Sequence, residues 1–90
     1  MPSIDVATLT RSLVDIDSTT GQEHQVGRWL ADTLRALGYA VVEQPVSDGR
    51  VNLWAHLHTT PTLVFSTHYD CVPPFFPSRL EGGVISGRGA

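Results

Sequence analysis

The sequence has no lysine, a single cysteine and no long apolar run, and each shortage excludes a class of protein. Six arginines against nine acidic residues leave a net charge of −3, which argues against a nucleic-acid or anionic-membrane surface. One cysteine cannot form an intrachain disulfide, so a disulfide-stapled secreted mini-protein is excluded. No apolar stretch approaches the roughly 20 residues that span a bilayer. No signal peptide is recognisable after Met1, so we expect a cytoplasmic protein.

The 90 residues are enough for one small domain or for part of a larger one. Apolar residues make up 41% and charged residues 17%, which is typical of a folded chain and not of a disordered one. A chain of this length buries only about 60–65% of its unfolded surface, so any core must be small.

The first helix is predicted over residues 3–17, where apolar side chains recur at spacings of three and four. Ser3 is placed to act as its N-cap. The stripe that would face the core consists of Val6, Leu9, Leu13 and Ile16.

A second helix is predicted to start at Gly21, because Thr20 and Glu23 form a Thr-x-x-Glu capping box. Gly38 is expected to end this helix in the left-handed conformation. Its apolar face consists of Val26, Trp29, Leu30, Leu34 and Leu37.

Three extended segments follow the helices. A strand over residues 39–44 is predicted to end at Pro45, and residues 51–58 alternate between apolar and polar, so the two form a hairpin with one buried face. Residues 62–67 contain the continuous apolar run Leu-Val-Phe, which is typical of a central strand covered on both faces. The fold class is therefore α/β, a mixed sheet flanked by helices. Two helices cannot cover both faces of such a sheet, so we expect residues 1–90 to be an incomplete, amino-terminal part of a domain.

His68 and Asp70 come directly after the predicted central strand, where open α/β sheets place their ligands. Residues i and i+2 project to the same side of a strand, so the imidazole and the carboxylate should be neighbours. Such a pair can bind a metal: one ring nitrogen ligates the ion while the carboxylate accepts the other ring N–H. The plainer alternative is a histidine that caps the strand and an aspartate that binds loop amides, and the spacing alone leaves both open.

Five short motifs match a known family in order and spacing. They are Leu-Val-Asp-Ile-Asp-Ser at 13–18, Leu-Gly-Tyr at 37–39, Arg-Val-Asn-Leu at 50–53, Ser-Thr-His-Tyr-Asp-Cys-Val-Pro at 66–73 and Gly-Arg-Gly-Ala at 87–90. In these motifs the chain resembles the zinc metallopeptidase family that contains acetylornithine deacetylase, succinyl-diaminopimelate desuccinylase, aminoacylase and carboxypeptidase G. It departs from the family at Tyr69 and Cys71, where Thr and Val are more usual.

The resemblance implies a zinc-exopeptidase-like fold and a metal-dependent amidohydrolase. His68 would ligate one of two zinc ions, with Co²⁺ or Mn²⁺ as alternative metals, and Asp70 would be the active-site carboxylate that orients it. The substrate would be an N-acyl amino acid or small peptide, as in acetylornithine deacetylase, and the full-length protein would be a homodimer. The family's other ligands and its general base have no counterpart in residues 1–90, so we expect this chain alone to be inactive.

Two rival functions and one further metal-like pattern remain. A non-catalytic α/β interaction module could keep the fold without the metal pair. A thiol hydrolase could use Cys71 with a histidine base, although an inert, mostly buried thiol is the favoured interpretation. His56 and His58 also lie two apart, but their position near a polar turn favours a solvated strand end.

Overall fold

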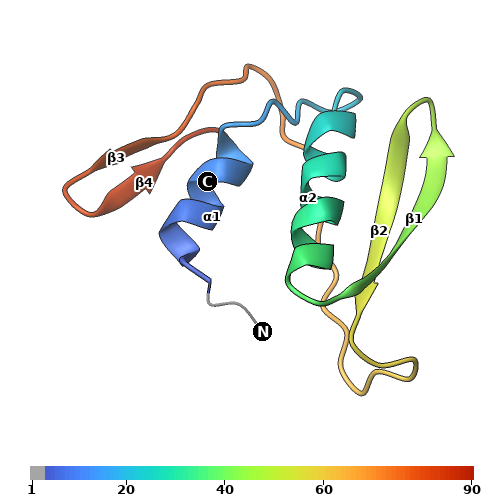
Figure 1. The fold of residues 1–90 in the computed structure, drawn as a ribbon. Helices are drawn as coiled ribbons and strands as arrows, with labels where there is room; N and C mark the ends of the chain where they lie inside the picture. Colours follow the sequence, from blue (N-terminus) through green and yellow to red (C-terminus); the bar gives the residue numbers. More distant parts are fainter. Residues whose placement is uncertain (1–3) are drawn as a thin grey trace.

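The computed structural model describes residues 4–90, which form two helices and two small antiparallel sheets. In chain order the elements are α1 (Val6–Val14), α2 (His24–Ala36), β1 (Ala40–Ser47), β2 (Arg50–His56), β3 (Arg79–Glu81) and β4 (Val84–Ser86). Figure 1 shows α2 between α1 and the β1–β2 hairpin, with the β3–β4 hairpin on the far side of α1. The α/β composition is confirmed, but over residues 4–90 the strands form two separate hairpins and not one mixed sheet.

Helix α1 is shorter than the periodic stretch that predicted it. Its N-cap is Asp5, whose Oδ1 accepts a hydrogen bond from the Ala7 backbone N–H at 3.2 Å. Ser3, the predicted cap, lies outside the described residues. Of the predicted stripe, Val6 is 70% exposed, whereas Val14 is the residue of the helix that is buried.

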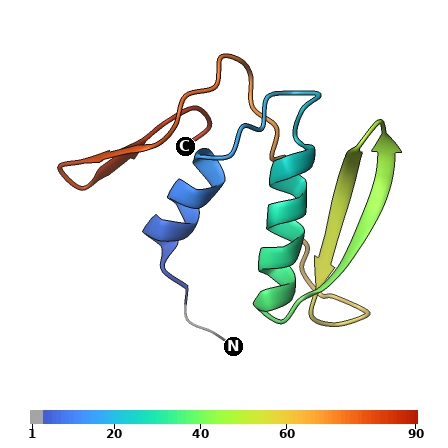
Figure 2. The ribbon, with the colours of Figure 1, turned by 45° about the horizontal axis from the view of Figure 1, so that its top comes forward.

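Polar contacts tie the end of α1 to the segment that leads into β3. Arg11 Nε donates to Ser78 Oγ at 3.0 Å, and the Ser78 backbone N–H donates to Asp15 Oδ1 at 2.6 Å. Gly87 packs against Val14 so closely that a Cβ there would lie 2.5 Å from its Cγ1. Figure 2 shows the C-terminus beside the end of α1.

Helix α2 begins at His24, three residues later than predicted, because the capping box does not form. Glu23 occupies the N-cap position without a side-chain cap hydrogen bond, and Thr20 is bonded elsewhere. The predicted end is confirmed: Gly38 has φ +99°, its N–H donates to Arg35 O and the next N–H donates to Leu34 O. This is the Schellman arrangement that closes a helix on a left-handed residue.

The β1–β2 hairpin is confirmed, but β1 does not stop at Pro45. The strand continues to Ser47, with Pro45 opposite Val51 and an irregularity in register between Pro45 and Ser47. Among residues 4–90 strand β1 pairs only with β2, which makes it an edge strand, and an edge strand tolerates proline. The predicted tight turn is present, with Gly49 at φ +69°.

The prediction of a central strand over residues 62–67 is wrong for the described chain. The segment has no regular secondary structure, and no strand among residues 4–90 pairs with it. Leu63 is 71% exposed, Val64 54% and Phe65 89%. The apolar run signals a preference for burial, but within residues 4–90 only α2 and β2 adjoin it, across an open cavity, and no strand pairs along it.

Little of the described chain is buried. The apolar residues in the core are Val14, Val26 and Ala31. The radius of gyration is 14.0 Å, above the about 12 Å of a compact chain of this length. The accessible surface is 6477 Å², against about 5,200 Å² for a monomer of this mass. No helix in residues 4–90 has the length and hydropathy of a membrane span.

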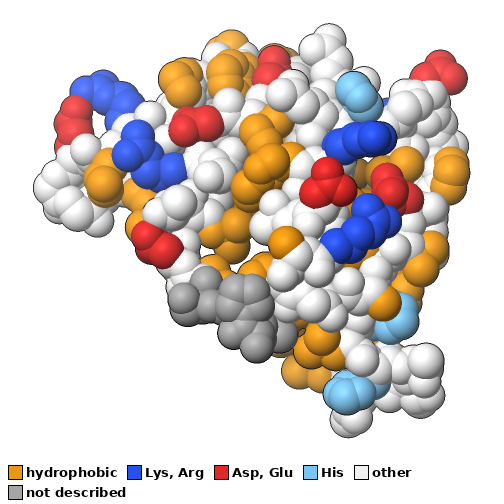
Figure 3. All heavy atoms as spheres, viewed as in Figure 1, with side chains coloured by type: hydrophobic (Ala, Val, Ile, Leu, Met, Phe, Trp, Pro, Cys, Tyr) orange, Lys and Arg blue, Asp and Glu red, His pale blue; other side chains and the backbone are white. Residues whose placement is uncertain are grey.

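Charged side chains of both signs gather over α2 and the hairpin (Figure 3). Arg35 bridges Asp32, one turn earlier in α2, at 3.7 Å and Glu43 of β1 at 3.1 Å. These pairs are exposed, so they contribute little to stability.

Candidate functional site

The structure brings His68 and Asp70 together at the end of the exposed segment. His68 Nδ1 lies 3.0 Å from Asp70 Oδ1 and 3.1 Å from the Asp70 carbonyl oxygen. A carbonyl oxygen and a carboxylate only accept hydrogen bonds, so Nδ1 is the ring nitrogen that carries the proton. The lone pair on Nε2 is then free for a ligand. The His68 side chain is 81% exposed, so solvent reaches it freely.

Asp70 is held at both carboxylate oxygens. Its Oδ1 faces the His68 imidazole, while its Oδ2 accepts a hydrogen bond from Thr20 Oγ1 at 2.8 Å. The hydrogen bond from Thr20 lowers the pKa of the Asp70 carboxyl below its ordinary value; partial burial opposes this, and the hydrogen bond and charge of His68 lower the pKa further. The carboxylate is therefore ionised at neutral pH, the state in which it accepts from both neighbours.

A short backbone seam places Thr20 opposite Asp70. Thr19 and Cys71 form an isolated parallel bridge, in which Cys71 N donates to Ser18 O at 2.8 Å and Thr20 N donates to Cys71 O at 3.0 Å. The seam joins residues about fifty positions apart. Sequence reasoning missed this role of Thr20, because the Thr-x-x-Glu pattern predicted a helix cap and no local signal revealed a partner so distant.

Buried polar groups support the loop that carries Thr20. Glu23 is 5% exposed, and its two oxygens accept from Arg50 Nε and from the Gly21 backbone N–H, each at 2.5 Å. Burial alone would raise the pKa of Glu23, but the hydrogen bonds from Arg50 and the backbone outweigh it and lower the pKa. The ion pair therefore anchors the start of α2 to the first residue of β2.

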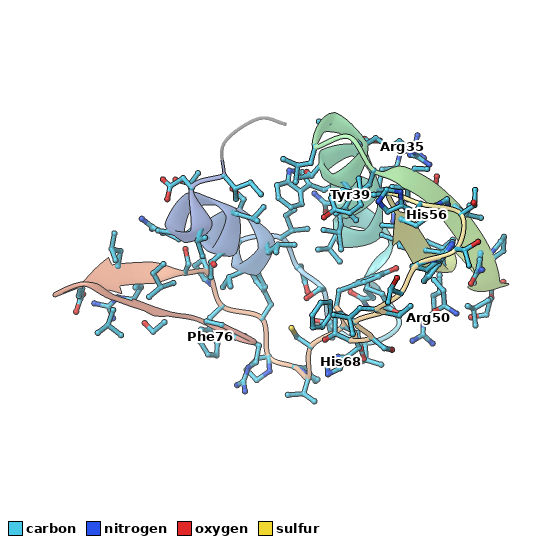
Figure 4. The ribbon with its side chains drawn as sticks, turned by 90° about the horizontal axis from the view of Figure 1, so that it is seen from below. Arg35, Tyr39, Arg50, His56, His68 and Phe76 are labelled. Atoms are coloured by element: carbon cyan, nitrogen blue, oxygen red, sulfur yellow. The ribbon has the colours of Figure 1, made fainter. Side chains whose placement is uncertain are left out.

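Tyr69 lies between the two candidate residues in sequence but faces the opposite way. Its hydroxyl donates to Val51 O at 2.5 Å and lies beside Gly27 of α2. Burial raises the Tyr69 pKa, and the nearby negative charge of Glu23 adds to the effect. Tyr69 thus anchors the segment to α2 and β2 and leaves its neighbours His68 and Asp70 directed away. Figure 4 shows His68 at the lower border of the molecule, with Arg50 to its right, on the β1–β2 hairpin.

An open cavity of about 540 Å³ adjoins the pair, between α2, β2 and the exposed segment. His68 and Asp70 form part of its lining, together with the residues Glu23, Leu30, Leu34, Arg50, Val51, Asn52, Leu53, Trp54, Val64, Phe65, Ser66, Thr67 and Tyr69. A groove of about 640 Å³ lies between α1 and α2 and includes neither His68 nor Asp70. The cavity that includes the pair is therefore the more relevant one for chemistry.

The donor set fits one metal ligand and its orienting carboxylate. An imidazole with a free Nε2, whose other nitrogen donates to an ionised carboxylate, is a common zinc ligand in proteins. Within residues 4–90 no group of three or more His, Cys, Asp or Glu side chains is placed to hold a metal ion. A catalytic zinc needs about three protein ligands. His68 would therefore have to act together with ligands from outside residues 4–90.

The other candidate residues lie apart from this pair. His56 Nδ1 contacts the His58 backbone oxygen at 3.2 Å, and its ring stacks on Trp54 with centroids 5.7 Å apart. Figure 4 shows His56 well separated from His68. The Cys71 thiol lies against Gly89, and its hydrogen-bond partner in the described residues is Arg88 O at 3.9 Å, not an imidazole. Neither arrangement resembles a second reactive site.

Comparison with known proteins finds curated relatives with one shared name. Three of these relatives are each named a probable carboxypeptidase. One from Aspergillus clavatus is 42% identical over 89% of this chain and 21% of its own length. A second from the same organism is 35% identical over 86% of this chain and 19% of its own length. One from Aspergillus flavus is 38% identical over 89% of this chain and 23% of its own length.

This chain spans about a fifth of the length of the curated relatives it matches. No family model and no solved structure matches it.

Proposed function

We propose that this chain is the amino-terminal part of the catalytic domain of a zinc-dependent hydrolase that cleaves an amide bond in a peptide or an N-acyl amino acid. The observation that carries the proposal is the free Nε2 of His68, whose Nδ1–H is held by an ionised Asp70. The names of the relatives support a peptide substrate. An acetylornithine deacetylase-like preference is the narrower version of the proposal.

In this proposal His68 ligates one zinc ion of a pair through Nε2, with Co²⁺ or Mn²⁺ as substitutes. A zinc pair supplies a Lewis acid for the scissile carbonyl and a bound water of lowered pKa. Asp70 keeps the proton on Nδ1, which directs the lone pair of Nε2 outward and raises the basicity of the ligand. The remaining ligands and the general base would come from parts of the protein outside residues 1–90, as would any surface for a homodimer.

The first experiment concerns the 90-residue chain itself. A catalytic zinc needs about three protein ligands, and this chain offers one imidazole at the site. We therefore expect neither tight zinc binding nor hydrolysis. Isothermal titration with zinc measures the affinity. Sub-micromolar binding that His68→Ala abolishes would contradict the expectation, because it would mean that these residues form a complete site.

The second experiment uses the full-length protein and a set of N-acyl amino acids and dipeptides. We expect His68→Ala to abolish hydrolysis and Asp70→Ala to reduce it by about 10–100-fold, the usual effect of removing a carboxylate that orients a ligand. His56→Ala is the matched control, because it removes an imidazole that stacks on Trp54 away from the pair. Near-native rates in both site variants would refute the proposal.

A non-catalytic interaction module is the second candidate, and the exposed Leu63, Val64 and Phe65 favour it, because an unpaired apolar segment can accept a strand from a partner. The same full-length experiment separates the two candidates. Hydrolysis that depends on His68 and is lost with a chelator supports the enzyme. A folded full-length protein that binds no zinc and hydrolyses none of the substrates supports the module.

A further inference from the structure

Thr20 lies in the loop between α1 and α2, with its hydroxyl directed at the candidate site. Its Oγ1 lies 2.8 Å from Asp70 Oδ2 and 3.4 Å from the Cys71 carbonyl oxygen. A threonine hydroxyl has one proton to donate, and the shorter distance and the negative charge of the acceptor both favour the carboxylate. The Thr20 side chain thus bonds to the group that holds His68.

We propose that Thr20 is a positioning residue for His68 and acts through the Asp70 carboxylate. The inference rests on the proposed function, because the ligand to be positioned is the His68 imidazole. A carboxylate rotates readily about its bond to Cβ, and an exposed one samples many orientations. With Oδ2 held by Thr20, Oδ1 stays opposite Nδ1–H, and the imidazole keeps the tautomer that leaves Nε2 free.

The seam allows the hydroxyl to be tested separately from the loop. Thr20 is held by its backbone N–H, which donates to Cys71 O at 3.0 Å, and by the adjacent bond from Cys71 N to Ser18 O. These bonds involve no side chain, so Thr20→Val removes the hydroxyl while the loop can stay in place. Thr20→Ser keeps the hydroxyl and should restore the wild-type behaviour.

The test uses the metal-free full-length protein with ¹⁵N-labelled histidine, at about two pH units above the ordinary imidazole pKa of about 6.5. Long-range ¹H–¹⁵N spectra report which ring nitrogen carries the proton. We expect His68 to be mostly the Nδ1–H tautomer in the wild type and in Thr20→Ser. In Thr20→Val we expect the ratio of Nδ1–H to Nε2–H to fall at least about threefold. A change of this size corresponds to the net free energy of roughly one hydrogen bond, the one by which Thr20 orients the carboxylate.

Thr33→Val is the matched control, because it makes the same chemical change in α2, where the Thr33 hydroxyl donates to Trp29 O at 2.8 Å. Its His68 spectrum should match that of the wild type. Backbone amide shifts verify that each variant is folded. If Thr20→Val does not fold, Thr20→Ala replaces it and is compared with Thr20→Ser. A His68 tautomer ratio that is the same with and without the Thr20 hydroxyl overturns the proposal, as does an equal change in Thr33→Val.

A second measurement, zinc affinity of the full-length protein, separates this inference from the proposed function. We expect Asp70→Ala to lower the zinc affinity by about 10–100-fold. Thr20→Val should lower it by a smaller factor, and Thr20→Ser should restore it. If zinc binds through His68 but Thr20→Val changes neither tautomer nor affinity, the positioning role fails and the proposed function stands. If the tautomer responds to Thr20 but His68→Ala leaves zinc binding unchanged, the proposed function fails.

Discussion

Gly27 is the residue of α2 at which a single added methyl group tests how the site segment is packed. An ideal Cβ at this position would lie 2.9 Å from the Tyr69 hydroxyl oxygen and 3.3 Å from Cζ of the same ring. Contacts this short require the ring to move. The Tyr69 hydroxyl is bonded to Val51 O at 2.5 Å, so a movement of the ring stretches or breaks that bond.

Three effects decide the stability of Gly27→Ala. Alanine is a better helix former than glycine and stabilises a helix interior by about 1 kcal/mol. Losing the Tyr69–Val51 hydrogen bond costs about 1 kcal/mol, and overpacking a well-filled site costs about 1–3 kcal/mol. The two costs outweigh the gain, so we expect Gly27→Ala to lower the free energy of unfolding by about 1–3 kcal/mol.

Urea unfolding followed by circular dichroism measures this difference, and a double-mutant cycle with Tyr69→Phe assigns it. Without the hydroxyl, the nearest ring atom to the new methyl is the carbon at 3.3 Å, which needs to shift by only a few tenths of an ångström. The cost of Gly27→Ala should therefore fall by about 1 kcal/mol or more in the Tyr69→Phe background. A Gly27→Ala variant that is more stable than the wild type in both backgrounds would refute this account of the packing.

Two further substitutions test the anchors of α2. Glu23 has a lowered pKa, so its contribution is complete above its ordinary pKa of 4.5 and is lost as the pH falls through the lower folded value. Glu23→Gln should therefore destabilise the chain by about 1–3 kcal/mol at pH 7 and by much less at about pH 3; urea midpoints that differ equally at both pH values would contradict this. Gly38 has φ +99° and no heavy atom within 4 Å of an added Cβ, so Gly38→Ala should cost only backbone strain, about 1–2 kcal/mol. Gly38→Asn should cost less, because asparagine tolerates this conformation; equal thermal midpoints for all three proteins would show that the conformation carries no such strain.

Features that depend on neighbouring residues could be predicted from the sequence. The end of α2 follows from Gly38 alone, since no other residue type adopts that conformation so readily. The β1–β2 hairpin follows from two extended patterns around a tight turn. The proximity of His68 and Asp70 was also foreseen, although the structure achieves it without the strand on which the argument relied. Their roles as ligand and catalytic residue stay predictions.

Features that depend on distant partners could not be predicted. The run at Leu63 to Phe65 shows a preference for burial, but the sequence does not show whether any covering element is present. A proline such as Pro45 would end a central strand, but an edge strand can continue through it. Which case applies depends on the number of strands that pair with β1, and the sequence does not show that number. The sequence predicted that Thr20 and Glu23 would cap α2. In the structure Thr20 bonds to Asp70 instead, and Glu23 bonds to Arg50.

The bridge between Thr19 and Cys71 joins two parts of the molecule. On one side α1 is tied to the β3–β4 hairpin through Ser78, and on the other α2 is tied to β2 through Arg50. The bridge lies where these halves meet, and Asp70 is next to it. Because Thr20 and Asp70 flank the bridge, a movement of one half against the other would change the contact between them, and through Asp70 it would reach the imidazole of His68.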